Sequence, residues 1–168
     1  MEEFFGSDHY IIANGMVSES CPSNIALIKY WGKYENQMPA NPSISYTLSQ
    51  CKTNTEIEFL AEKTFSVQTF LAGKEEKKFA EKIEKYFKNI EQYLPWILKG
   101  KYIIKTENTF PHSSGIASSA SGFGAIAKCL MDLDDQFTGK SDEEYKRKKA
   151  SFLARLGSGS ACRSLYDG

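Results

Sequence analysis

The chain has 168 residues, the length of one ordinary domain, and hydrophobic residues make up 41% of it. These values exclude collagen-like and wholly disordered chains, so we expect a packed core. Lys and Arg together number 21, and so do Asp and Glu, which gives a formal net charge of zero. Because proteins that bind nucleic acids usually carry a basic excess, we expect no nucleic acid partner.

The four cysteines are widely spaced, with no CxxC pair, at Cys21, Cys51, Cys129 and Cys162. This spacing argues against a zinc site and a dense disulfide framework, and it favours a reducing compartment. The amino-terminal residues lack the basic and apolar regions of a signal peptide, and no later apolar run approaches the ~18 residues of a membrane span. We therefore expect a cytoplasmic protein with no membrane partner.

Four segments have the residue pattern of strands, with alternating apolar residues or many β-branched and aromatic ones. They are residues 43–49, 55–59, 65–70 and 102–106. We predict that the first three form an antiparallel meander. The short apolar stretches 10–12 and 16–17 predict an earlier strand, interrupted by the Asn14-Gly15 turn signal.

Apolar residues recur every three or four positions in three later segments, as in amphipathic helices. These segments are 79–94, 120–131 and 145–156. Pro95 ends the first and Gly157 the third, and Ser141 with Glu144 has the form of a capping box for the third. The order of strands, helix, strand, helix, helix predicts an α+β fold in one domain.

The serine-rich segment 111–122 is the strongest local signal for chemistry, because it leads from a predicted strand into a predicted helix. Gly115 can adopt a positive φ, and unpaired N–H groups at a helix start suit a phosphate. Ser118, Ser119 and Ser121 could donate to phosphate or surround Mg²⁺, which prefers oxygen ligands. A capped helix behind a plain loop explains the same residues, and the Walker pattern is absent.

The segment 21–33 gathers polar and cationic groups that suit an anionic substrate. A core or boundary position for the aromatic residues, with solvated lysines, is the competing interpretation. The candidates are Asn24, Lys29, Tyr30, Trp31 and Lys33.

A third candidate, segment 157–164, places small residues and serines before an arginine. A backbone nest with Ser160 and the planar guanidinium of Arg163 can hold a carboxylate or phosphate bidentately. A surface loop with a capping serine remains the alternative.

The motifs together resemble the GHMP kinase superfamily and, more narrowly, the N-terminal half of the diphosphomevalonate decarboxylase family. The resemblance implies an α+β GHMP-kinase N-terminal domain over residues 1–168, similar to ribosomal protein S5 domain 2, with a sheet packed against helices. The matching stretches are PSNIALIKYWGK (22–33), NPSISYTLS (41–49), FPHSSGIASSASGF (110–123) and GSGSACRSLYDG (157–168).

What the resemblance implies is an ATP-dependent decarboxylation of mevalonate 5-diphosphate to isopentenyl diphosphate in isoprenoid biosynthesis. The family's C-terminal domain, with the aspartate proposed as general base, is absent from these 168 residues. We therefore expect these 168 residues alone to have no catalytic activity. A homodimer is one expectation for the full-length protein. The alternatives are a sister kinase that phosphorylates mevalonate or its phosphate, and a non-catalytic module that binds ATP or phosphate.

The resemblance also implies roles for individual residues. Lys29, Ser160 and Arg163 would be catalytic, with Lys29 beside the reacting C3 oxygen and Arg163 on the carboxylate. Substrate would further contact Asn24, Tyr30, Lys33 and Ser158. Ser119 would also bind Mg²⁺. The ATP phosphates would lie against Gly115, Ala117, Ser118, Ser119 and Ser121.

Overall fold

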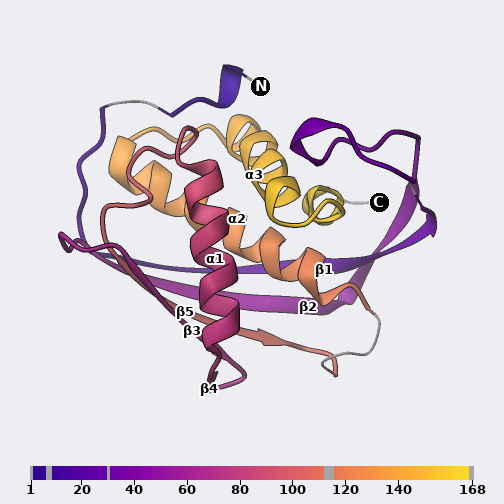
Figure 1. Cartoon of the computed structure of the whole chain (residues 1–168), viewed down its shortest axis with the longest axis horizontal. Helices are drawn as coiled ribbons and strands as arrows, with labels where there is room; N and C mark the ends of the chain where they lie inside the picture. Colours follow the sequence, from indigo (N-terminus) through magenta and orange to yellow (C-terminus); the bar gives the residue numbers. More distant parts are fainter. Residues whose placement is uncertain (1, 7–8, 30, 112–115, 167–168) are drawn as a thin grey trace.

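The computed structural model describes residues 2–6, 9–29, 31–111 and 116–166. In these ranges a mixed sheet of five strands carries three α-helices on one face (Figure 1). The strands are β1 (Gly15–Ile28), β2 (Ile44–Leu60), β3 (Ser66–Leu71), β4 (Lys74–Glu75) and β5 (Lys101–Asn108). The α-helices are α1 (Lys77–Ile90), α2 (Ser118–Thr138) and α3 (Glu143–Gly157), with short 3₁₀ helices η1 (Glu2–Phe4), η2 (Glu35–Gln37) and η3 (Ala161–Leu165).

The sheet order is β1-β2-β5-β3-β4, so the predicted meander is wrong. β5 pairs antiparallel with β2 and parallel with β3, which separates the two strands expected to be neighbours. The apolar stripe of α1 explains the change. Because parallel neighbours need a crossover connection, the chain passes from β3 through α1, which covers the sheet, before it returns as β5.

The two longest strands extend beyond their predicted limits. β2 is a single strand of 17 residues where alternation predicted two, and β1 continues to Ile28 although only its start was predicted. Residues 52–54 of the polar stretch between the predicted halves pair with β1, and residues 49–51 form the irregularity opposite the register shift at Pro22/Ser23. Residues 10–12 lie outside any strand.

The predicted helices are present, with corrected ends. α1 stops at Ile90, and Leu94 is buried in the turns that follow. The cap of α3 is Asp142 and not Ser141, because the Asp142 carboxylate accepts the Tyr145 N–H at 3.0 Å. The α+β class is confirmed. Within the described ranges, no helix combines the length and hydropathy needed to cross a bilayer.

The core lies between the sheet and the helices and is rich in aromatic rings. Phe59 contacts the rings of Trp96, Tyr102 and Phe137. One charged pair is buried among them: Lys149 Nζ lies 3.3 Å from Asp134 Oδ2, while Trp96 Nε1 donates to Asp134 Oδ1 at 2.7 Å. These contacts join α2, α3 and the turn after α1 at one buried carboxylate.

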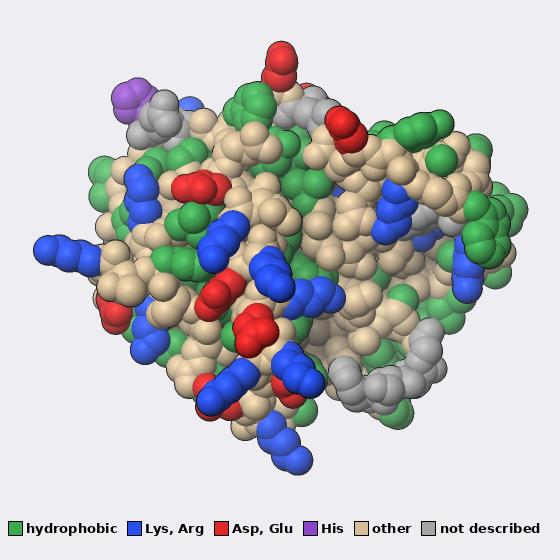
Figure 2. All heavy atoms as spheres, viewed as in Figure 1, with side chains coloured by type: hydrophobic (Ala, Val, Ile, Leu, Met, Phe, Trp, Pro, Cys, Tyr) green, Lys and Arg blue, Asp and Glu red, His purple; other side chains and the backbone are tan. Residues whose placement is uncertain are grey.

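Two kinds of surface are visible in one view of the molecule (Figure 2). Lysines and glutamates are interspersed over the outer face of α1, as expected for a solvated helix face. Hydrophobic side chains gather at the upper right rim, over the segment that joins β1 to β2, where Trp31, Tyr34 and Met38 are exposed. The two tryptophans therefore differ fully in environment, since Trp31 is 80% exposed and Trp96 is buried.

Candidate functional site

Two buried residues of β1 connect all three candidate motifs. Ser23 Oγ donates to the carbonyl of Ile116, in the middle of the serine-rich segment, over 2.5 Å. Asn24 Nδ2 donates to the Ser160 carbonyl at 3.1 Å and to Ser164 Oγ at 2.7 Å. Sequence reasoning missed Ser23 and Ser164 as site residues, although both lie inside the quoted motifs. The three motifs are thus neighbours in space.

The serine-rich segment begins α2 in a way that leaves donors available. Ala117 has a left-handed backbone (φ 37°), and no side chain caps the first turn. The free N–H groups and the positive end of the helix dipole suit an oxyanion. Ser119 is exposed, and its Oγ lies 3.5 Å from Ser158 Oγ. The serine-rich segment and segment 157–164 therefore face each other. Gly115 lies outside the described residues.

Ser121 occupies a different place from the other two serines. Its side chain is fully buried, and its hydroxyl lies 2.6 Å from Thr53 Oγ1 in β2 and donates to the Ser118 carbonyl at 3.2 Å. A hydroxyl already engaged on both sides does not face the loop. The geometry gives Ser121 the part of an anchor between α2 and β2, and it gives no support to direct contact with a nucleotide.

A cavity of about 370 Å³ adjoins Ser118 and Ser119, between the start of α2 and α1. Phe79 and Phe123 supply apolar surface to its lining, and Lys82 supplies a cation, whose Nζ lies 4.9 Å from the Phe123 ring centroid. Concave sites with apolar walls and a few polar groups are typical of small-molecule binding.

The residues predicted to bind substrate are only partly brought together. Arg163 Nη1 donates to Ser43 Oγ at 2.8 Å, so η3 contacts the start of β2. Lys33 Nζ donates to the Gln37 side chain, and Gln37 Nε2 to the Leu156 carbonyl at 3.5 Å, which directs this segment towards the end of α3.

Two lysines and two aromatic residues complete the first motif. Lys29 and Lys33 are exposed, and neither lines the cavity beside Ser118 and Ser119. Trp31 is exposed as well, whereas Tyr30 lies outside the described residues. Lys29 directly follows the last residue of β1, Ile28, which pairs with Ile44 at the start of β2.

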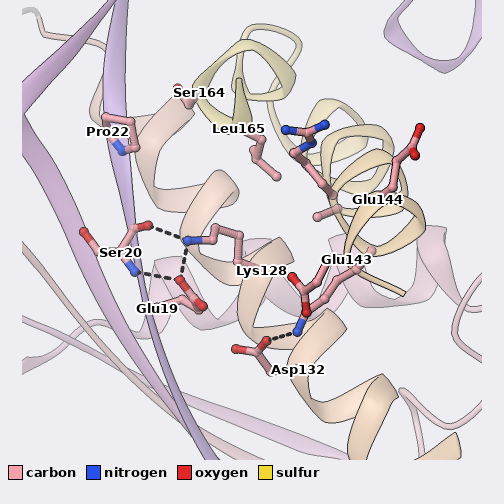
Figure 3. Close-up of a pocket in the computed structure, with 12 residues that line it drawn as sticks. Glu19, Ser20, Pro22, Lys128, Asp132, Glu143, Glu144, Ser164 and Leu165 are labelled. Atoms are coloured by element: carbon pink, nitrogen blue, oxygen red, sulfur yellow. Dashed lines mark hydrogen bonds and ion pairs between the residues drawn. The ribbon is translucent and has the colours of Figure 1, made fainter. Parts of the chain in front are cut away.

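A larger cavity, of about 630 Å³, lies between β1, α2 and α3 (Figure 3). Its lysines are already neutralised: Lys128 pairs with Glu19, and Lys146 lies 2.7 Å from Asp132 Oδ1. Burial raises the pKa of the Asp132 carboxyl, which Lys146 opposes. These ion pairs join neighbouring elements, and size alone does not make the cavity a binding site for an anion.

The thiols of Cys21 and Cys129 are expected to resist alkylation in the folded protein. Both are buried, and burial raises the pKa of Cys21 to about 12 and that of Cys129 well above its usual range. With iodoacetamide at about pH 8, the half-buried Cys51 and Cys162 should react first, as read by peptide mass spectrometry. Equal labelling of all four cysteines without denaturant would contradict this expectation.

The same shifts carry a pH dependence of stability. Above about pH 9 an unfolded chain releases thiol protons that folded Cys21 and Cys129 retain. Since the folded state then binds more protons, stability falls as the pH rises through this range.

Residues 21–168 match the family model described as the diphosphomevalonate decarboxylase-like N-terminal domain. The chain belongs to this family. Curated diphosphomevalonate decarboxylases from Saccharomyces cerevisiae and Homo sapiens are 35% and 34% identical, each over 90% of this chain. The chain spans only 40% and 39% of these two relatives. The resemblance inferred from the motifs is confirmed.

Solved structures of mevalonate diphosphate decarboxylases share the fold of the chain. The Staphylococcus aureus enzyme superposes with a TM-score of 0.74 at 36% identity, over 92% of this chain and 45% of that one. The Legionella pneumophila enzyme gives 0.73 at 36% identity, over 90% and 49%. The predicted GHMP-kinase type of fold is therefore confirmed.

Proposed function

We propose that this chain is the GHMP-kinase N-terminal domain, over residues 1–168, of an enzyme that decarboxylates mevalonate 5-diphosphate to isopentenyl diphosphate with ATP and Mg²⁺. The observation that carries the proposal is the pair of hydrogen bonds from Asn24 to the Ser160–Ser164 segment, together with the Ser23 bond to Ile116. These bonds hold a segment suited to phosphate beside a segment suited to a second anion, as a reaction between two anionic molecules requires.

The nucleotide end of the site would lie at the start of α2. Ser118 and Ser119 offer hydroxyl groups, and the uncapped first turn after Ala117 offers N–H donors for the ATP phosphates. The sequence adds the backbone of Gly115 to this prediction. The Ser119 hydroxyl would be an oxygen ligand for Mg²⁺, which prefers oxygen and keeps several waters. A relative from Enterococcus faecalis is described by its mevalonate diphosphate-mediated ATP binding, and a related structure by its complex with MVAPP, AMPPCP and magnesium.

The substrate end would use residues of the first and third motifs. In the reaction the C3 hydroxyl takes the γ-phosphoryl group from ATP, and loss of phosphate and CO₂ then leaves a carbon–carbon double bond. Lys29 would favour the negative charge that develops on the C3 oxygen. Ser158, Ser160 and Arg163 would hold the carboxylate end, and Tyr30 and Lys33 the diphosphate.

Asn24 takes a positioning part in this proposal, because its side-chain N–H groups already bind Ser160 and Ser164. It would fix the third motif instead of touching substrate.

The setting we propose is the cytoplasm, which agrees with four free cysteines in a chain of this size. A homodimer of the full-length enzyme remains a prediction, and mevalonate 5-diphosphate is the small-molecule partner.

Ser119→Ala is expected to weaken binding of a non-hydrolysable ATP analogue with Mg²⁺ by about tenfold, the loss of one hydrogen bond to a charged group. Isothermal titration calorimetry measures the affinity for the analogue. Ser141→Ala is the matched control, because Ser141 is exposed and Asp142, not Ser141, caps α3. Unchanged affinity in Ser119→Ala would argue against the proposed nucleotide site. In an assay of the full-length enzyme, ADP with CO₂ supports the decarboxylase, whereas ADP alone favours the sister kinase.

A further inference from the structure

Two arginines line one cavity, and one of them, Arg155, lies outside every motif. The cavity, of about 430 Å³, is open to solvent and is lined by the first half of β2, the end of α3 and η3. β2 contributes the hydroxyl residues Ser45 and Thr47, Ser43 lies just before β2, and α3 and η3 contribute Arg155 and Arg163. No Asp or Glu is among the described residues that line it, so none of these residues neutralises the positive charge.

Most N–H donors of the two guanidinium groups lack a strong acceptor within the described part of the chain. Arg163 donates once, to Ser43 Oγ at 2.8 Å. Arg155 Nη1 lies 2.6 Å from the Met38 sulfur, which is a weak acceptor, whereas a guanidinium carries five N–H donors. No ion pair of the described residues includes either arginine.

This cavity differs from the one in Figure 3 in the state of its cations. There Lys128 and Lys146 are held by Glu19, Asp132 and nearby groups, so that cavity is neutralised from within. Around Arg155 and Arg163 no described residue supplies such a charge, which favours an anionic ligand there. Two planar forks match the paired oxygens of a carboxylate or phosphate group, which the point charge of a lysine does not.

The cavity also lies next to the proposed active site. Thr47 is the register partner of Asn24, the residue that binds the Ser160 carbonyl. Arg163 belongs to the same short helix, η3, that Ser160 precedes. A ligand reaching from Ser160 towards β2 would therefore meet both arginines.

We infer that Arg155 joins Arg163 in a two-arginine subsite that binds an oxyanion end of the substrate. The identity of the ligand rests on the proposed function, whereas the subsite rests on the cavity and its unneutralised charge. Arg155 is new in this role, since the motif resemblance assigned only Arg163 to the substrate. The carboxylate and the diphosphate of one substrate are the two sources of the oxyanion.

The test is an NMR titration of the arginine Nε–Hε groups. The chain has only three arginines, so Arg→Gln variants assign the three signals. Inorganic pyrophosphate and mevalonate are added separately, because one carries only the diphosphate and the other only the carboxylate. We expect at least one of them to shift the Arg155 and Arg163 signals with a single dissociation constant.

Arg155→Gln should weaken this binding by about tenfold at the Arg163 signal, as loss of a charged hydrogen-bonding partner does. Arg155→Lys should recover only part of the loss, because it keeps the charge without the fork. Lys148→Gln, which removes a positive charge from an exposed position of the same helix, should leave the affinity unchanged.

A stationary Arg155 signal while Arg163 moves would overturn the inference, and so would equal weakening by Lys148→Gln and Arg155→Gln. Failure of the subsite is separable from failure of the proposed function. Binding of the ATP analogue without any arginine shift overturns the subsite alone. Joint arginine shifts without binding of the analogue support the subsite and count against the proposed nucleotide site.

Discussion

Asp134→Ala is expected to lower the free energy of unfolding by about 3–5 kcal/mol, the cost of removing one partner from a buried ion pair. Asp134 accepts from Trp96 Nε1 at 2.7 Å and lies 3.3 Å from Lys149 Nζ, whose residue is only 2% exposed. Without the carboxylate, a buried ammonium group and a buried indole N–H lose their acceptor together. Urea unfolding followed by circular dichroism measures the change.

The control for this prediction is Glu56→Ala, which removes the partner of Lys105 on the outer face of the sheet. Because both groups of that pair are solvated, we expect no measurable change. Asp134→Leu combined with Lys149→Met should recover part of the loss, since no unpaired charge then remains buried. If Asp134→Ala lowers the free energy of unfolding no more than Glu56→Ala does, the buried Asp134–Lys149 pair does not stabilise the fold as expected.

Gly124→Ala is expected to destabilise the chain by about 1–3 kcal/mol, the usual cost of overpacking a filled core. A Cβ at Gly124 would lie 2.4 Å from Cys21 Sγ and 3.3 Å from Cys21 Cβ, so β1 has to move away from α2. Gly122, two residues earlier in the same helix, has nothing within 4 Å of such a Cβ. Gly122→Ala should therefore be neutral, or stabilise by up to about 1 kcal/mol through helix propensity.

The displaced strand gives Gly124→Ala a second readout. Cys21 lies in β1 just before Ser23 and Asn24, which hold the candidate motifs together. The thiol should therefore react with iodoacetamide faster in Gly124→Ala than in the Gly122→Ala control. Equal stability and equal thiol reactivity in the two variants would contradict close packing at Gly124.

The local elements of this fold could be read from the sequence better than their arrangement. The stripe that includes Ile83, Phe87 and Ile90 predicted α1 because helix periodicity is a property of neighbouring residues. The insertion of β5 between β2 and β3 depends on pairing across long stretches of chain, which no local pattern encodes.

The candidate site shows the same division. The motif text named the segments that carry the candidate residues, and the hydrogen bonds of Asn24 join two of them. It did not separate Ser121 from Ser119, although Ser121 lies four residues before Ala125 and eight before Cys129, on an apolar face of α2 that could have placed its side chain inside. No short motif could have predicted a role for Arg155, because Arg155 and Arg163 come to line one cavity only when α3 and η3 have folded beside β2.

The late position of β5 in the sequence sets the order in which the ribosome can complete this sheet. β2 is finished at Leu60 and β3 at Leu71, but their common neighbour spans Lys101–Asn108. Until β5 emerges, the edge of β2 that pairs with it has no partner. The side chains of Ile57 and Phe59 then lack part of the core that buries them in the finished fold. Non-local pairing of this kind folds slowly. A ribosome stalled before residue 101 therefore presents an aggregation-prone hairpin, and the sheet is complete only when the chain up to Asn108 has emerged.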